Sequence, residues 1–301
     1  MPVCRFEPAL VEAVILAELE QSERRGDQRL TRAYHRAADP LYETTAPDQL
    51  NAAFDELHAD FFNQWGFARL VAATFNEFPE LQKRAPSLLV LAARSKSEEG
   101  AVIGRDGNSV CLRLLTGRFA DRDRLGAFIR HELLHAADML DDAFGYRVEY
   151  SESIGAANLL ADRYRALWCA HIDARLIRRG LKPLVDRETH GHDFDARFNR
   201  ATERARAAAF AQLWQADRLT HAQITALARQ PHLQDDQHRA ANVPGAPCPL
   251  CRFPTHRWAA EIPPGVVAAI RIDFPHWQTE AGACERCVEV YALQTNMGVP
   301  A

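Results

Sequence analysis

The chain has 301 residues, of which 47% are hydrophobic and 25% are charged, which is the composition of a folded globular protein rather than a disordered or fibrous one. At about 100–200 residues per domain, this length predicts two domains, or one domain with an appendage. The formal net charge of -4 gives no electrostatic support for a dedicated nucleic-acid or membrane binder. Seven cysteines, an odd number, favour metal binding over a disulfide framework.

The N-terminal sequence has none of the features of a secretory signal. Its apolar run is interrupted by Glu12 and Glu18, and no basic segment precedes it. No window approaches about 18 uninterrupted apolar residues, so no membrane-spanning helix is expected. We therefore expect a cytoplasmic protein whose thiols remain reduced.

Helical periodicity dominates the first part of the chain. Apolar residues recur at helical spacing over residues 8–38 and again over 48–77, and prolines such as Pro40 punctuate these stretches. The pattern predicts an N-terminal helical segment over residues 1–84 whose apolar side chains pack in a core.

Shorter apolar runs come next. Ser87–Arg94 and Ser109–Leu115 predict two strands of a small sheet, because a glycine-rich turn segment separates them. Asp121 or Asp123 is the expected N-cap of the helix that carries the sequence FIRHELLHAADML. Further helices are predicted over residues 153–180, 193–216 and 219–229.

The first candidate site is the motif His131-Glu132-Leu-Leu-His135. On a helix, residues i and i+4 lie on one face, so both imidazoles can bind one zinc ion while Glu132 lies beside an open coordination position. Zinc lowers the pKa of a bound water to about 7, and the carboxylate can take its proton as a general base. The motif therefore predicts a hydrolase of the metalloprotease type. A di-iron carboxylate site would need a second ExxH, which the chain lacks.

A catalytic zinc usually has three protein ligands, and this motif provides two. Asp138 lies one helical turn beyond His135, whereas Asp141 has the metzincin spacing but lacks the glycine that this pattern needs at position 138. The candidates for the third ligand are Asp138, Asp141, Glu149, Glu152, His190 and His192.

Supporting residues are also expected around the metal. Ligating histidines usually donate their second N–H group to a carboxylate or a carbonyl. Tyr146 or Tyr150 could stabilise a developing oxyanion, while Cys4, Cys111 and Cys169 are interpreted as small buried apolar residues. The carboxylates considered for orienting the histidines are Asp138, Asp142, Asp162 and Asp173.

The second candidate site consists of two CxxC pairs, Cys248-Pro-Leu-Cys251 and Cys284-Glu-Arg-Cys287. Four thiolates hold zinc tetrahedrally and leave no open position, so these pairs predict a structural ion in a zinc ribbon. The metal supplies folding energy to a domain too small for a large core. Acidic residues slightly outnumber arginines here, which does not support binding to phosphates.

HExxH, followed by His190-Gly191-His192-Asp193-Phe194 and then by two CxxC pairs, resembles the SprT-like (Spartan-type) zinc metalloproteases. The resemblance implies that His190 is the third zinc ligand, immediately before a helix, and that Phe194 packs inward. It makes His192 an alternative ligand or a hydrogen-bond donor to the transition state. It covers roughly residues 85–290 but departs from compact members in the 54 residues between His135 and His190. It also implies protein substrates, and its extension to DNA-bound ones is not supported by the charge.

We therefore predict an α+β, mostly helical protein that binds two zinc ions, one catalytic and one structural. The expected function is peptide-bond hydrolysis, with Glu132 as general base and His131, His135 and His190 as metal ligands. The alternatives are a non-catalytic zinc-binding adaptor and a small-molecule amide hydrolase; a long groove along a sheet edge would favour peptide substrates. The predicted parts are the N-terminal helical segment 1–84, a zincin-like core 85–230, a polar, proline-containing linker 231–247 and the zinc ribbon 248–292.

Overall fold

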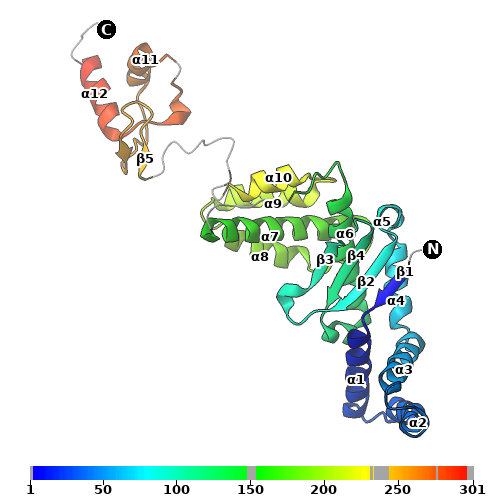
Figure 1. The fold of residues 1–301 in the computed structure, drawn as a ribbon. Coiled ribbons are helices and arrows are strands. Elements are labelled where there is room, and N and C mark those ends of the chain that lie inside the picture. The colour runs from blue at the N-terminus through cyan, green and yellow to red at the C-terminus, as the bar shows by residue number, and fades with distance from the viewer. Residues whose placement is uncertain (1–2, 148–153, 231–232, 234–243, 276, 297–301) are drawn as a thin grey trace. The chain divides into compact units, whose positions relative to one another are not determined.

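The computed structural model describes residues 3–147, 154–230, 233, 244–275 and 277–296 (Figure 1). The protein is α+β and mostly helical with a small sheet, as predicted. The chain divides into two units, one of Met1–Arg197 with Phe210–Arg229 and the other of Phe198–Ala209 with Gln230–Ala301. In the described part of the chain, every helix is too short or too polar to cross a membrane.

A four-stranded sheet in the order β1-β2-β4-β3 lies in the first unit (Figure 1). The two predicted strands, β2 (Ser87–Ala92) and β4 (Ser109–Leu114), are its parallel centre. β1 (Val3–Phe6) pairs parallel with β2, and β3 (Gly100–Ile103) pairs antiparallel with β4. These edge strands were not predicted, because four residues are too few to give a strand periodicity. Since β1 pairs with β2, the N-terminal segment shares one sheet with the residues that follow position 84.

The N-terminal helices are shorter than predicted, because left-handed glycines separate them. Gly26 (φ 77°) follows the first helix and Gly66 (φ 80°) separates the third from the fourth, in a conformation that favours glycine. Pro40 lies inside the second helix rather than at its end. The helices are α1 (Pro8–Arg24), α2 (Arg29–Thr44), α3 (Leu50–Gln64), α4 (Phe67–Asn76) and α5 (Pro79–Arg84).

Three phenylalanines join these helices to the segment that precedes the motif helix. The Phe67 ring lies 5.3 Å from Phe62 and 5.6 Å from Phe119, between ring centroids, and its side chain is 1% exposed. Phe67→Ala is expected to lower the free energy of unfolding of the first unit by about 3–5 kcal/mol, because a cavity replaces the ring. Urea denaturation followed by circular dichroism measures this. Leu16→Ala, at a residue 47% exposed, is the control and should cost about 1 kcal/mol or less; equal losses would contradict the assignment of this core.

The helix that carries the HELLH motif is α6 (Arg122–Leu140), which follows the 3-10 turn η2 (Thr116–Ala120). Asp121 is its N-cap, as predicted, and accepts a hydrogen bond from the Arg124 N–H at 3.0 Å. Arg130 donates two hydrogen bonds of 2.6 Å to Glu77, just beyond α4. The helix also contacts β3 and α7 (Ile154–Arg178), so its motif lies between the sheet edge and a second helix.

The later helices differ from the prediction in their number. One helix was predicted over residues 193–216, but the structure has two, α8 (Arg187–Arg197) and α9 (Glu203–Gln215). α10 (His221–Ala228) begins with a capping box between Thr220 and Gln223. A 3-10 turn, η1 (Lys96–Glu98), precedes β3.

The second unit contains the CxxC pairs and a small core. A helix, α11 (Pro264–Asp273), lies between the pairs in the sequence, and α12 (Glu285–Asn296) carries the last cysteine. The short strands β5 (Ala246–Pro247) and β6 (Pro254–Thr255) pair antiparallel, and the 3-10 turn η3 (Thr279–Ala281) precedes Cys284. Its buried residues are Cys248, Leu250, Val266, Ile270, Trp277, Ala283, Cys284 and Tyr291.

Candidate metal centres

The two histidines of the motif converge as the helical spacing predicts. Their Nε2 atoms lie 3.1 Å apart, and the residues are 2% and 7% exposed for His131 and His135 respectively. Two imidazole nitrogens on one tetrahedral zinc ion, at about 2.0–2.1 Å from the metal, lie about 3.3 Å apart. The separation therefore fits a shared metal ion.

Asp173, on α7, holds one of these imidazoles in place. His131 donates its Nδ1–H to Asp173 Oδ1 at 2.9 Å, and this contact orients the ring so that its Nε2 is directed toward His135. The carboxylate, completely buried, also accepts hydrogen bonds from the N–H groups of Leu184 and Val185. Asp173 was one of four unranked carboxylates in the sequence, and only the packing of α7 on α6 selects it.

The charge of the imidazole pair is unevenly distributed. Burial lowers the pKa of His131, but the hydrogen bonds and negative charges of Asp173 and Cys169 together outweigh burial and raise the pKa to about 10. Burial and the neighbouring His131 hold the pKa of His135 well below its usual value. The protonated His131 can therefore donate a hydrogen bond to the neutral His135 across the 3.1 Å between their Nε2 atoms, and a metal ion bound there would replace that proton.

Cys169 joins the pair from α7. Its Sγ lies 3.6 Å from His135 Nε2, and the ligand atoms of Cys169, His131 and His135 all lie within 4.8 Å of one another. This group could hold a metal ion. The sequence interpretation of Cys169 as a small apolar residue missed it. The available signal was the spacing of Cys169 and Asp173, which at i and i+4 face the same way on a helix.

His190, the third ligand implied by the family resemblance, lies elsewhere. It is inside α8 rather than before it, and its Nε2 donates a hydrogen bond of 2.8 Å to Asp173 Oδ2. Asp173 therefore lies between His190 and His131, and His190 does not belong to the converging group. Phe194 is buried, as the resemblance implies, whereas His192 is exposed.

The carboxylates considered as third ligands are committed to other partners. Both oxygens of Asp138 accept hydrogen bonds from Arg175, at 2.8 and 2.7 Å, and one also accepts from Trp168 Nε1 at 2.9 Å. Asp141 forms an ion pair with Arg218. Glu149 and Glu152, together with Tyr150, lie outside the described residues.

Glu132 faces the edge of the sheet. Its Oε2 accepts a hydrogen bond of 2.9 Å from the Ala101 N–H on β3. A Cβ added at Gly100 (φ 140°) would lie 3.3 Å from the same oxygen. The absence of a side chain at Gly100 therefore lets the Glu132 carboxylate approach the strand. Burial raises the pKa of Glu132, although the charge on His131 and the Ala101 N–H act in the opposite direction. A raised pKa suits a general base that must take and return a proton near neutral pH.

A cleft of about 810 Å³ opens over these residues, within the first unit. Glu132, His135 and Cys169 line it, and a continuous stretch of chain from Ser97 to Val102 forms one wall. Tyr146, a predicted oxyanion-stabilising candidate, contributes to the lining together with Tyr164 and Trp168. The cleft therefore places the histidine motif and the open edge of β3 around one space.

No protein-family model, curated protein or solved structure matches this chain. The resemblance to SprT-like proteases thus rests on the motifs alone, and it stays a hypothesis.

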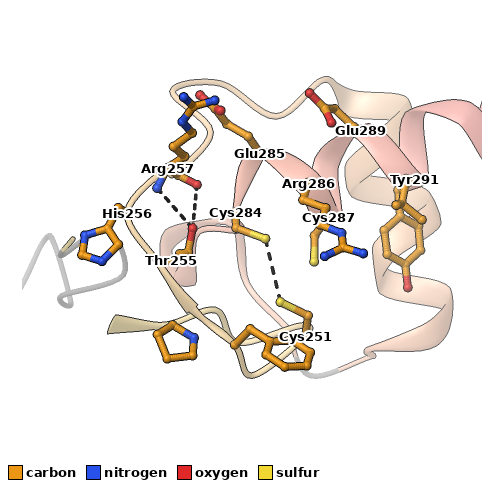
Figure 2. A pocket seen from close by; sticks show the side chains of 13 residues that line it. Cys251, Thr255, His256, Arg257, Cys284, Glu285, Arg286, Cys287, Glu289 and Tyr291 are labelled. Atoms are coloured by element: carbon orange, nitrogen blue, oxygen red, sulfur yellow. Dashed lines mark hydrogen bonds between the residues drawn. The ribbon is translucent and has the colours of Figure 1, made fainter. Parts of the chain in front are cut away.

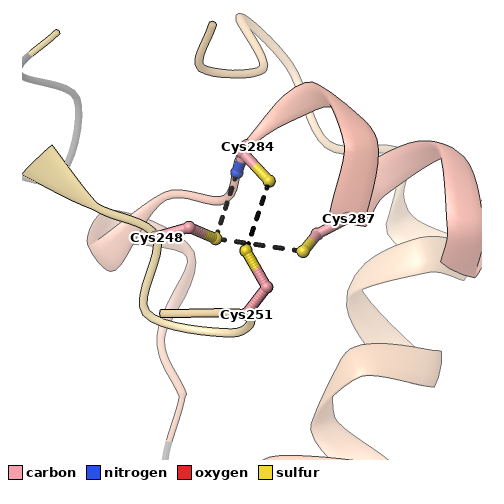
Figure 3. A group of neighbouring side chains, drawn as sticks. All are labelled: Cys248, Cys251, Cys284 and Cys287. Atoms are coloured by element: carbon pink, nitrogen blue, oxygen red, sulfur yellow. Dashed lines mark hydrogen bonds between the residues drawn. The ribbon is translucent and has the colours of Figure 1, made fainter. Parts of the chain in front are cut away.

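The four cysteines of the second unit form a separate cluster (Figure 3). The Sγ atoms of Cys248 and Cys287 lie 3.9 Å apart, and those of Cys251 and Cys284 are separated by the same distance. Four thiolates about 2.3 Å from one tetrahedral zinc lie about 3.8 Å from one another. The cluster could therefore bind a metal ion, as predicted from the CxxC pairs.

Backbone groups prepare this cluster for a cation. The Cys284 N–H donates to Cys248 Sγ at 3.4 Å. Burial raises the pKa of the Cys248 thiol, but N–H groups of Cys251 and Cys284 outweigh it and lower the pKa to about 7. A thiol that ionises near neutral pH is ready to become a metal ligand.

A hollow of about 610 Å³ is lined by Cys251, Cys284 and Cys287. Figure 2 shows the side chains around it. Arg257 and Arg286 line it, and so do Glu285 and Glu289. The lining therefore carries acidic and basic side chains in equal number among these four residues.

Proposed function

We propose that the first unit hydrolyses peptide bonds, using a zinc ion held by His131 and His135 and Glu132 as the general base. The observation that carries the proposal is the convergence of the two Nε2 atoms, 3.1 Å apart, in a cleft that Glu132 also lines. A bound zinc ion supplies a polarised carbonyl and a water whose pKa falls to about 7. Glu132 would act there as general base, accepting a proton from the attacking water and passing it to the leaving amine.

The edge of β3 favours an extended peptide as the substrate. The Gly104 N–H bonds to Ser109 on β4, and the Ala101 N–H bonds to Glu132 on the other side. Because backbone polar groups alternate between the two sides of a strand, the Ala101 carbonyl and the N–H and carbonyl of Ile103 also point away from β4. These groups, unlike the Ala101 N–H that bonds to Glu132, are the ones that a substrate strand could pair with. A substrate chain can add to such an edge as a further strand, with its scissile bond over the metal. A small amide would leave most of this wall without a contact.

Metal removal tests the proposal directly. The purified chain is expected to hold two zinc ions and to cleave an unfolded protein such as casein, because each unit has a group of converging side chains that could hold a metal ion. Treatment with 1,10-phenanthroline should reduce cleavage to background as the open site loses its ion, and added zinc should restore it. Metal content by atomic emission and cleavage by gel electrophoresis follow both steps.

Two outcomes would contradict the proposal. Cleavage that persists in metal-free protein would exclude a zinc-dependent mechanism. Full zinc content without cleavage of any unfolded protein would instead indicate an adaptor, and turnover restricted to short acylated amides would indicate a small-molecule hydrolase.

A further inference from the structure

We infer that Cys169 is the third protein ligand of the metal in the first unit, which makes this a site of two imidazoles and one thiolate. The inference rests on the proposed metal site at His131 and His135, and it names the group that completes that site. The third ligand is thus a thiolate with a negative charge, in place of the neutral imidazole of His190 that the family resemblance implies.

The distances suit this ligand set. A thiolate at about 2.3 Å and an imidazole nitrogen at about 2.0–2.1 Å from a tetrahedral zinc lie about 3.6 Å apart. Cys169 Sγ and His135 Nε2 are 3.6 Å apart, and Cys169 and His131 are also within the 4.8 Å that encloses all three ligand atoms. Three ligands leave a fourth tetrahedral position for water, on which hydrolysis depends.

Competing ligands in the described residues are already engaged. His190 directs its Nε2 at Asp173, and Asp138 is bound by Arg175 and Trp168. Asp173 itself accepts four hydrogen bonds, two from imidazoles and two from backbone N–H groups. Cys169, in contrast, has its Sγ atom directed at the two imidazoles, 3.6 Å from His135 Nε2.

The side chains of the site come from two helices. α6 supplies both histidines, four residues apart, and α7 supplies Cys169 and Asp173 at the same spacing. One face of α7 thus brings a ligand to the metal and an acceptor to His131 Nδ1. The Trp168 ring meets the His135 ring edge to face, at 4.3 Å between centroids and 89°, and so restricts how that imidazole turns.

A thiolate ligand has chemical consequences for this centre. It lowers the net charge of the metal with its protein ligands by one unit relative to three imidazoles. Soft thiolate favours zinc over hard ions such as magnesium or calcium.

Cadmium-113 NMR of the full chain, with both ions exchanged for cadmium, reports the number of sulfur ligands at each site. Two resonances are expected, one at the strongly deshielded position of four thiolates and one at the intermediate position of nitrogen ligands with a single sulfur. Cys169→Ser should move only the second resonance, toward the region of nitrogen and oxygen ligands. Its affinity for zinc should fall by more than the about 10–100-fold that loss of a supporting hydrogen-bond partner costs.

Two further variants distinguish the loss of a metal ligand from a change in the residues around the site. Cys111→Ser, on β4 and outside the converging group, is the matched control and should leave both resonances in place. His190→Ala should keep the single-sulfur resonance, because His190 acts through Asp173. A second resonance that already lies at a sulfur-free position in the unmodified protein would overturn the inference, whether or not the variants fold.

The test also distinguishes this inference from the proposed hydrolysis. A single-sulfur resonance that depends on Cys169, in a protein without peptidase activity, would support the ligand set and refute the hydrolase. Metal-dependent cleavage with a second resonance that Cys169→Ser does not move would refute the ligand set alone.

Discussion

Glu132→Gln is expected to lower kcat/KM for peptide hydrolysis by about 10²–10⁴-fold, which is the range for loss of a general base. Glutamine keeps the shape of the side chain, and its carbonyl oxygen can still accept the hydrogen bond from the Ala101 N–H that Glu132 accepts at 2.9 Å. It cannot take a proton from water at neutral pH. Both zinc ions should therefore remain bound while turnover is lost.

Steady-state kinetics on a fluorogenic peptide, together with metal analysis of the same samples, measure this separation. Glu12→Gln, at an exposed position on α1, is the matched control and should retain normal kinetics and both ions. If Glu132→Gln kept its full rate, the assignment of the base would be wrong. A reduced zinc content in that variant would mean that the carboxylate supports the metal rather than the proton transfer.

Cys284→Ser is expected to unfold the second unit and leave the first one folded. Cys284 is buried next to Cys248, and its backbone also forms a bridge with Trp258. Structural zinc contributes about 10–16 kcal/mol of apparent binding free energy in small zinc domains, which a core of this size cannot replace. The zinc content should fall from two ions per chain to one.

Limited proteolysis and tryptophan fluorescence detect the change, since Trp277 is buried in this unit and donates to the Gly282 carbonyl at 3.0 Å. Cys4→Ser, on β1 of the first unit, provides the comparison and should keep both ions and the protease resistance of the second unit. Two ions per chain in Cys284→Ser would show that the four cysteines do not form a structural site.

The helix faces and the two cysteine pairs could be predicted because they follow from local spacing. Residues four apart on a helix share a face whatever the helix packs against, so His131 and His135 converge as expected. Asp121 caps the same helix by a contact only three residues long. The two thiols within each CxxC pair are likewise close because only two residues separate them. The apolar runs of β2 and β4 identify the two central strands of the sheet.

The partners of the histidines depend instead on how α7 packs against α6. Asp173 is 42 residues from His131 and Cys169 is 34 residues from His135, and neither separation has a periodic signal in the sequence. A cysteine within a helix has the same sequence signature whether it fills a core or lies near two histidines, so the position of Cys169 beside His135 follows only from the packing of the two helices. The same is true of the Ala101 contact to Glu132, because which side of β3 remains open is settled by strand pairing. Local spacing thus determined which side chains share a face, and only tertiary packing decided what that face meets.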